Sequence, residues 1–153
     1  MIDSSIFIGA YSEGRSSEEC EILLRGAVNN VYLGHVTTII LGEIMKKLLK
    51  FKREADYRYE TIRESILNDL LSFRTLYICE ETIKNHSDLR IRWEGQSQDK
   101  LNLSCAIENK CMLFIMDDSY FTYNKKGCPT AIVQINDRSN KRLKKLLEEI
   151  KSR

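Results

Sequence analysis

Acidic residues stand at both ends of the segment 99–121, which reads DKLNLSCAIENKCMLFIMDDSYF. The apolar spacing after Asp99 predicts a helix over residues 99–109, and the apolar run at 112–116 predicts a buried strand. Each arm is about 15 Å long, at ~1.5 Å per helical residue and ~3.3 Å per strand residue. Because the strand runs back along the helix, we expect Asp99 to lie at the same edge as Asp117 and Asp118.

Two further acids are expected at that edge. Asp3 follows Met1 and Ile2, which we interpret as the end of a very short strand. Glu43 lies early in a helix that Thr37 or Thr38 is expected to cap and whose apolar face extends to Leu49. In parallel sheets, the carboxyl ends of the strands form the functional edge. Four segments are therefore predicted to bring carboxylates together.

The rest of the chain alternates short apolar segments with helical patterns, which predicts a parallel sheet covered on both faces. Further strands are expected at residues 31–36, 76–79 and 130–135. Further helices are expected at 16–28, 54–73 and 82–93, with a terminal helix that starts at Asn136 or Ser139.

Clustered carboxylates repel one another, so without a counter-ion some of them would bind protons. A divalent cation removes this conflict, and all-oxygen ligands suit Mg²⁺ or Mn²⁺. Such an ion can lower the pKa of its water and stabilise the charge on a leaving oxygen, which indicates phosphodiester hydrolysis.

Each acid also has an ordinary structural interpretation. Asp99 could favour the helix dipole, Asp118 could cap the next turn, and Asp3 could belong to a turn. Glu43 could pair with Lys47 at i,i+4. The order of all four along the chain favours the metal site.

Composition limits the class of protein. With 153 residues, we expect one domain over residues 1–153, and the 24 basic and 22 acidic residues leave little net charge. The five cysteines are odd in number and lie mostly in apolar runs, which favours reduced core thiols. No apolar stretch is long enough for a membrane span, so we expect a soluble, cytoplasmic protein without membrane association.

The segments MIDSSIFIGAY, TTIILGEIMKKL, DKLNLSCA and FIMDDSYF resemble, in this order, the four acidic motifs of PIN-domain ribonucleases, the family that includes VapC-type toxins. The resemblance implies a three-layer α/β/α sandwich with a short central parallel sheet of four or five strands. It also implies a Mg²⁺ or Mn²⁺ site and endonucleolytic cleavage of RNA. By motif, Asp3, Glu43, Asp99 and Asp118 take the catalytic and metal-binding roles, Asp117 is a further metal ligand, and Ser5 supports the first acid.

Clustered lysines could bind the phosphates of RNA by releasing counterions. They follow Glu43 (Lys46, Lys47 and Lys50) and Asp118 (Lys125 and Lys126), and a solvated face is the alternative. Within the family, the chain could be a toxin with an antitoxin partner or an RNA-processing enzyme, and we expect a homodimer. The alternatives are a non-catalytic PIN-like module that binds RNA or protein and, less favoured, a nuclease that cleaves DNA.

Overall fold

Four short strands form two parallel pairs. The structure is a computed structural model, and it describes residues 1–12, 17–53, 57–82, 84, 97–117, 129–135 and 140–152. Strand β1 (His35–Thr37) pairs with β2 (Arg74–Leu76), and β3 (Leu113–Met116) pairs with β4 (Ala131–Gln134).

Residues 1–3 join the two pairs into one sheet. Ile2 N donates to His35 O of β1 over 3.0 Å, and Asp3 N donates to Ile115 O of β3 over 2.9 Å. Ile115 N donates in turn to Met1 O over 3.0 Å, and Ile2 bridges Ile115 in parallel. The order across the sheet is β2, β1, residues 1–3, β3 and β4. The predicted parallel sheet of four or five strands is confirmed.

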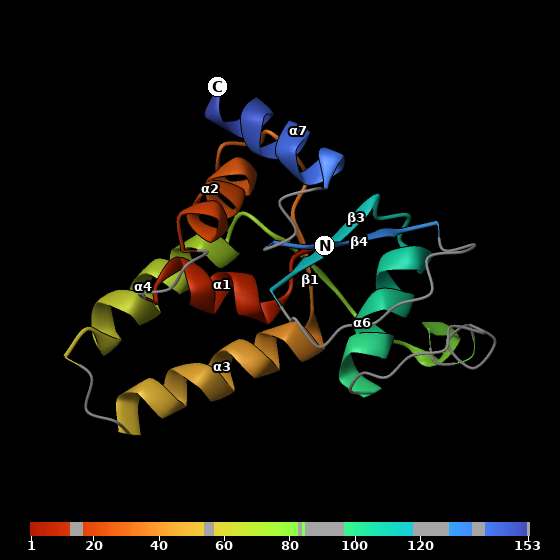
Figure 1. Cartoon of the computed structure of the whole chain (residues 1–153). Helices are drawn as coiled ribbons and strands as arrows, with labels where there is room; N and C mark the ends of the chain where they lie inside the picture. Colours follow the sequence, from red (N-terminus) through yellow and green to blue (C-terminus); the bar gives the residue numbers. More distant parts are fainter. Residues whose placement is uncertain are drawn as a thin grey trace.

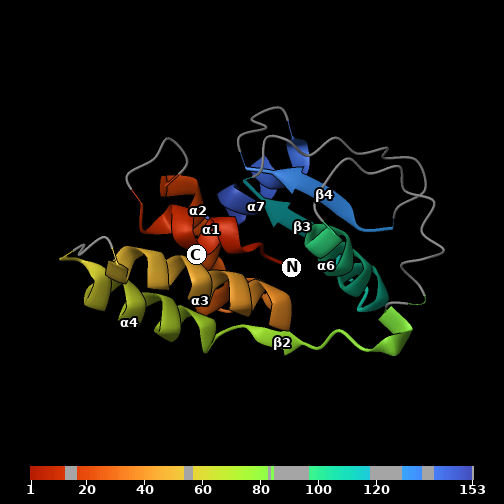
Figure 2. The ribbon, with the colours of Figure 1, turned by 90° about the horizontal axis from the view of Figure 1, so that it is seen from below.

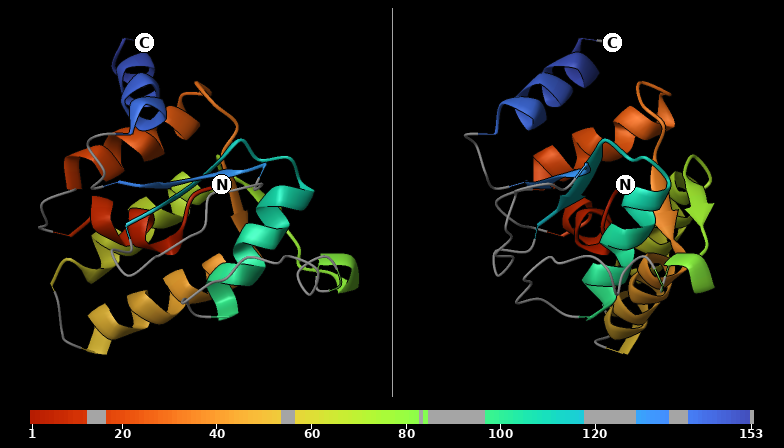
Figure 3. Two further views of the ribbon diagram at one scale, coloured as in Figure 1. Left: turned by 45° about the vertical axis from the view of Figure 1, so that its right-hand side comes forward. Right: turned by 90° about the vertical axis from the view of Figure 1, so that its right-hand side faces the viewer.

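Helices cover this sheet on two sides. They include α1 (Ser4–Ala10), α2 (Ser17–Val28), α3 (Thr38–Arg53), α4 (Tyr59–Leu70), α6 (Ser97–Glu108) and α7 (Lys141–Lys151). Helices α2 and α7 lie on one side of β3 and β4, and α6 lies on the other (Figures 1 and 3). Helices α3 and α4 run side by side (Figure 2). This is the predicted three-layer α/β/α arrangement.

The core lies between these layers. Helix α3 contributes Ile40, Ile44 and Leu48 at helical spacing, and all three are buried, as is Phe114 of β3. Phe7 of α1 contacts Phe73 edge to face, with ring centroids 5.0 Å apart. The apolar faces expected from the sequence thus point inwards.

Two strands start at other residues than predicted, because backbone N–H groups near their starts make hydrogen bonds that the sequence pattern did not indicate. Residues 31–34 were expected in a strand, but Asn30 has a φ of 56° and Val31 N donates to Gly26 O, which ends α2 in a turn. Strand β2 begins at Arg74 rather than Leu76, because Arg74 N already donates to Gly34 O over 2.9 Å.

Some helix bounds also differ from the prediction. Helix α4 begins at Tyr59 rather than Glu54, and α6 begins at Ser97, which was expected to precede it as a cap. Helix α7 is capped by Asn140, whose side-chain oxygen accepts from Arg142 N and Leu143 N, rather than starting at Asn136 or Ser139. Most of the helix predicted at 82–93 lies outside the described residues.

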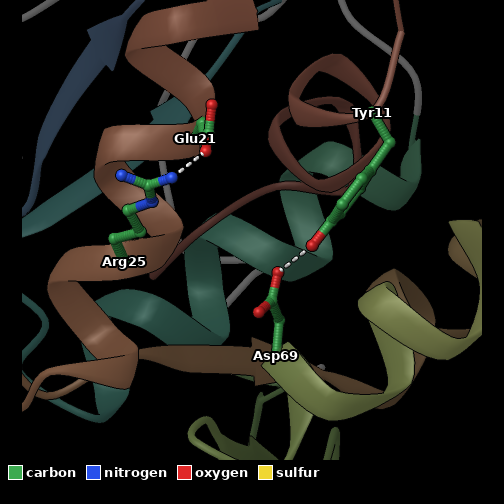
Figure 4. A network of polar contacts seen from close by, with 4 residues as sticks. All are labelled: Tyr11, Glu21, Arg25 and Asp69. Carbon is green, nitrogen blue, oxygen red and sulfur yellow. Dashed lines mark hydrogen bonds and ion pairs between the residues drawn. The ribbon is translucent and has the colours of Figure 1, made fainter.

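A polar contact ties α1 to α4. Tyr11 Oη donates to Asp69 Oδ2 over 2.6 Å, beside the Glu21–Arg25 ion pair on α2 (Figure 4). Of the four cysteines that the structure describes, Cys20, Cys105 and Cys111 are buried and Cys79 is exposed. Within the described ranges, no helix is both long enough and apolar enough to cross a membrane.

Candidate functional site

Asp3 is held by the helix that follows it. Its carboxylate caps α1, because Oδ2 accepts from Ser5 N over 2.8 Å and from Ser5 Oγ over 2.7 Å. Asp3 is almost fully buried, at 6% exposure. Both bonds use Oδ2, so this cap leaves Oδ1 available to another partner.

Ser5 connects Asp3 to the end of β3. Its hydroxyl donates to Asp3 and accepts from Asp117 N over 3.0 Å. A hydroxyl can do both at once, because it carries one proton and two lone pairs. Ser5 therefore fixes the carboxylate of Asp3 relative to the backbone of Asp117.

Glu43 lies in the second turn of α3, facing α1. Its Oε2 accepts from Ser4 Oγ over 2.8 Å, and Lys47 Nζ lies 3.5 Å from the same Ser4 oxygen. Burial is the main reason that the pKa of Glu43 is raised above its ordinary value. The negative charge of Asp3 raises it further, while the Ser4 hydrogen bond and the charges of Lys47 and Lys46 oppose the shift. For Glu43, burial thus matters more than the expected repulsion between acids.

Asp99 and Asp117 reach the site from α6 and from the end of β3. Asp99 lies in the first turn of α6, where the helix dipole favours negative charge, and it is half-buried. Asp117 follows the last residue of β3 and is also half-buried. Their positions follow from the helix, turn and strand that were predicted over residues 99–116.

One pocket collects these acids. It has a volume of about 840 Å³ and is lined by carboxylates from four segments: Asp3, Glu43, Asp99 and Asp117. Its other charged lining residues are Lys46, Lys47, Lys50 and Arg53, all from the second half of α3. The structure therefore places the predicted basic cluster of α3 beside the acids. Asp118, Lys125 and Lys126 lie outside the described residues.

The donors of this pocket fit a hard divalent cation in type, because they are carboxylate oxygens without a histidine or thiolate. Within the described parts of the chain, however, no three acidic, histidine or cysteine side chains lie close enough to hold a metal ion. The pocket has the donor chemistry of a magnesium or manganese site without a closed set of ligands.

Ser4 is the site residue that the sequence reasoning missed. It is 3% exposed and lines the pocket, where its hydroxyl contacts Glu43. A second small polar residue directly after Asp3 was the available signal. The contact itself could not be inferred, because Ser4 and Glu43 are 39 positions apart.

The carboxylates lie at the carboxyl edge of a parallel sheet in a three-layer α/β/α fold, which is the edge where folds of this kind bind their ligands. The family profile described as PIN domain matches residues 1–126, and the chain belongs to the PIN-domain family. PIN domains are generally nucleases that act on nucleic acids and typically use divalent metal ions. A comparison with curated proteins finds no match.

Proposed function

We propose that this chain is a metal-dependent endoribonuclease that hydrolyses RNA phosphodiester bonds, and that residues 1–153 form a single nuclease domain. The observation that carries the proposal is the convergence of Asp3, Glu43, Asp99 and Asp117 on one pocket. Four segments far apart in sequence supply these carboxylates, and no single helix cap or surface pair requires that arrangement.

In this proposal, Mg²⁺ or Mn²⁺ is held by Asp3, Glu43 and Asp99 together with Asp117, Asp118 or both. A bound divalent cation would lower the pKa of an attacking water and neutralise charge on the phosphate. Ser5 and Ser4 orient the carboxylates of Asp3 and Glu43 through their hydrogen bonds.

RNA would enter along the basic half of α3. Lys46, Lys47 and Lys50 line the same pocket as the acids, so phosphates next to the reacting one would contact them. Lys125 and Lys126 are proposed as further phosphate contacts. The biological setting is proposed to be cytoplasmic, as a toxin with an antitoxin or as an RNA-processing enzyme, in either case as a homodimer.

The second candidate is a PIN-like module that binds RNA or protein without cleaving it. The absence of three close ligands among the described side chains favours this candidate. The convergence of four carboxylates favours the enzyme, because a binding module has no need for clustered negative charge near a phosphate.

An assay of tRNA and rRNA cleavage, with Mn²⁺ or with EDTA, distinguishes the enzyme from the non-catalytic module. Asp99→Asn is nearly isosteric and removes one ligand charge, so turnover should fall by about two orders of magnitude or more while the circular dichroism spectrum stays unchanged. The matched control is Glu148→Gln, which also removes one negative charge but lies on the exposed face of α7. If wild type and Asp99→Asn cleave equally, or neither cleaves with Mn²⁺, the enzyme proposal fails.

A further inference from the structure

A fully buried asparagine lies one turn beyond Asp99 on α6. Asn102 has no exposed surface, and its Oδ1 accepts from Thr37 Oγ1 over 2.5 Å. Thr37 is the last residue of β1, and its hydroxyl also accepts from Ile40 N over 3.1 Å at the start of α3. The contact therefore joins the start of α3 to the first half of α6.

Among the described residues, one of the two polar atoms of the Asn102 amide has no hydrogen-bond partner. Asn102 Nδ2 is buried and has no hydrogen-bond partner within the part of the chain that the structure describes. If the amide is turned by 180°, Nδ2 contacts Thr37 Oγ1 and Oδ1 becomes the atom without a partner. One polar atom of the amide therefore stays unpaired in either orientation. A buried polar atom without a partner costs folding free energy, so the contact with Thr37 is made at the cost of one unpaired amide atom.

Thr37 and Asn102 lie on the two elements that carry the second and third acids. Glu43 follows Thr37 by six residues along α3, and Asn102 follows Asp99 by three along α6. Side chains of an α-helix lean towards its N-terminus, so Asn102 leans towards the turn that holds Asp99.

We propose that Asn102 is a positioning residue of the metal site. Through Thr37 it fixes the distance between α3 and α6, and hence between Glu43 and Asp99. Its second amide atom orients the carboxylate of Asp99 through one bridging water. This inference rests on the proposed function, because it assigns Asn102 to the support of the acids that line the same pocket.

The proposal predicts that metal affinity falls while stability changes little. Asn102→Leu keeps the branched shape of the side chain and removes the unpaired amide atom, but it also leaves the Thr37 hydroxyl without its acceptor, so in EDTA its melting temperature should stay close to that of wild type. Its affinity for Mn²⁺, measured by titration calorimetry, should fall by about 10- to 100-fold, as for other groups that orient metal ligands. Its single-turnover cleavage rate should fall as well.

Cys105→Ala is the matched control on the same helix. Cys105 is also buried, but its Sγ lies 4.0 Å from Tyr77 O and does not line the pocket, so its loss should leave Mn²⁺ affinity unchanged. Thr37→Ser keeps the hydroxyl and should retain the affinity of wild type. If Asn102→Leu fails to fold, Asn102→Ala replaces it, because alanine cannot clash with its neighbours, and it should show the same loss of Mn²⁺ affinity of about 10- to 100-fold.

The outcomes separate the two proposals. If wild type shows no Mn²⁺-dependent cleavage, the proposed function fails, and this inference fails with it. If wild type cleaves but Asn102→Leu or Asn102→Ala binds Mn²⁺ as tightly as wild type, only the positioning role is overturned. A melting temperature that falls with unchanged Mn²⁺ affinity would make Asn102 a packing residue.

Discussion

At Asp3, the structural role of a helix cap and the proposed role of a metal ligand are compatible, although the sequence presented them as alternatives. Its Oδ2 caps α1 through Ser5, as a structural acid would. Its carboxylate nevertheless lines the pocket that Glu43, Asp99 and Asp117 also line. A helix cap fixes a carboxylate in one orientation, which is what a metal ligand requires. At this residue the structural and functional interpretations support each other.

A titratable pair away from the pocket gives a pH prediction. Burial raises the pKa of Asp69 above its ordinary value, and the charge of Glu21 adds to this effect, although the hydrogen bond from Tyr11 opposes it (Figure 4). A raised folded-state pKa means that the folded protein binds more protons than the unfolded chain in the interval between the two pKa values. This residue's contribution to stability therefore falls as the pH rises from the unfolded to the folded pKa.

Asp69→Asn removes that dependence and keeps an oxygen to accept from Tyr11. Urea unfolding of both proteins from pH 3 to pH 8 should show the variant gaining stability relative to wild type as the pH rises. Tyr11→Phe, which removes the hydrogen bond but keeps the acid, should leave the pH dependence in place. A difference that is constant with pH, or that shrinks as pH rises, would contradict the burial effect.

What could be predicted for single residues depends on how far apart the partners lie in sequence. The convergence of Asp99 and Asp117 followed from one helix and one strand of similar length. Ser5 stands two residues from Asp3, so its support was predictable as a local contact. The Thr37–Asn102 contact spans 65 positions and depends on how α3 packs against α6, which no local pattern reports.

Helix α3 shows how one element supplies both core and site. Its buried stripe of Ile40, Ile44 and Leu48 sets the rotation of the helix about its axis. That rotation directs Glu43, Lys46 and Lys50 towards the pocket. The apolar pattern predicted this helix well. The positions of β1 and β2 were less predictable, because strands of three residues depend on their pairing partners more than on their own sequence.

The basic half of α3 is tested by charge reversal. If it binds phosphates, Lys47→Glu with Lys50→Glu should weaken RNA binding and reduce the slope of log K against log salt by about one per lost contact. The measurement is a fluorescence anisotropy titration at several salt concentrations, in EDTA to prevent cleavage. Lys141→Glu with Lys144→Glu, on exposed positions of α7, makes the same change in net charge away from the pocket. Equal slopes for the two double variants would place the α3 cluster on a face that does not bind RNA.

For the whole molecule, residues 1–3 hold the site together because they hold the sheet together. They hydrogen-bond to β1 on one side and to β3 on the other. Glu43 enters with the helix after β1, and Asp117 enters at the end of β3. The acids meet only because these two parallel pairs form one sheet. The alternation of strands and helices predicted that sheet, but the join through so short a segment depends on tertiary contacts.

If the proposed cation binds among these acids, its binding is linked to the stability of the whole fold. A cation that binds the folded chain but not the unfolded one stabilises it by RT ln(1 + [L]/Kd), about 2.7 kcal/mol at 100 times Kd. For a domain of this size, that corresponds to a rise in melting temperature of about 5 to 10 °C. Wild type should therefore melt higher with Mn²⁺ than with EDTA.

Glu43→Gln should reverse its rank against wild type when Mn²⁺ is added. Without metal, the charge of Glu43 is opposed by burial and by Asp3, whereas glutamine still accepts a hydrogen bond from Ser4. In EDTA at pH 7 the variant should therefore melt at or above the temperature of wild type. With Mn²⁺ it should melt below wild type, because it has lost one ligand charge and gains less from binding. Glu148→Gln, an exposed charge change on α7, should follow wild type in both conditions. If Mn²⁺ raises neither melting temperature, the cation does not bind in this pocket. If Glu43→Gln is the less stable protein in EDTA, Glu43 stabilises the fold through Ser4 and Lys47 and the expected reversal fails.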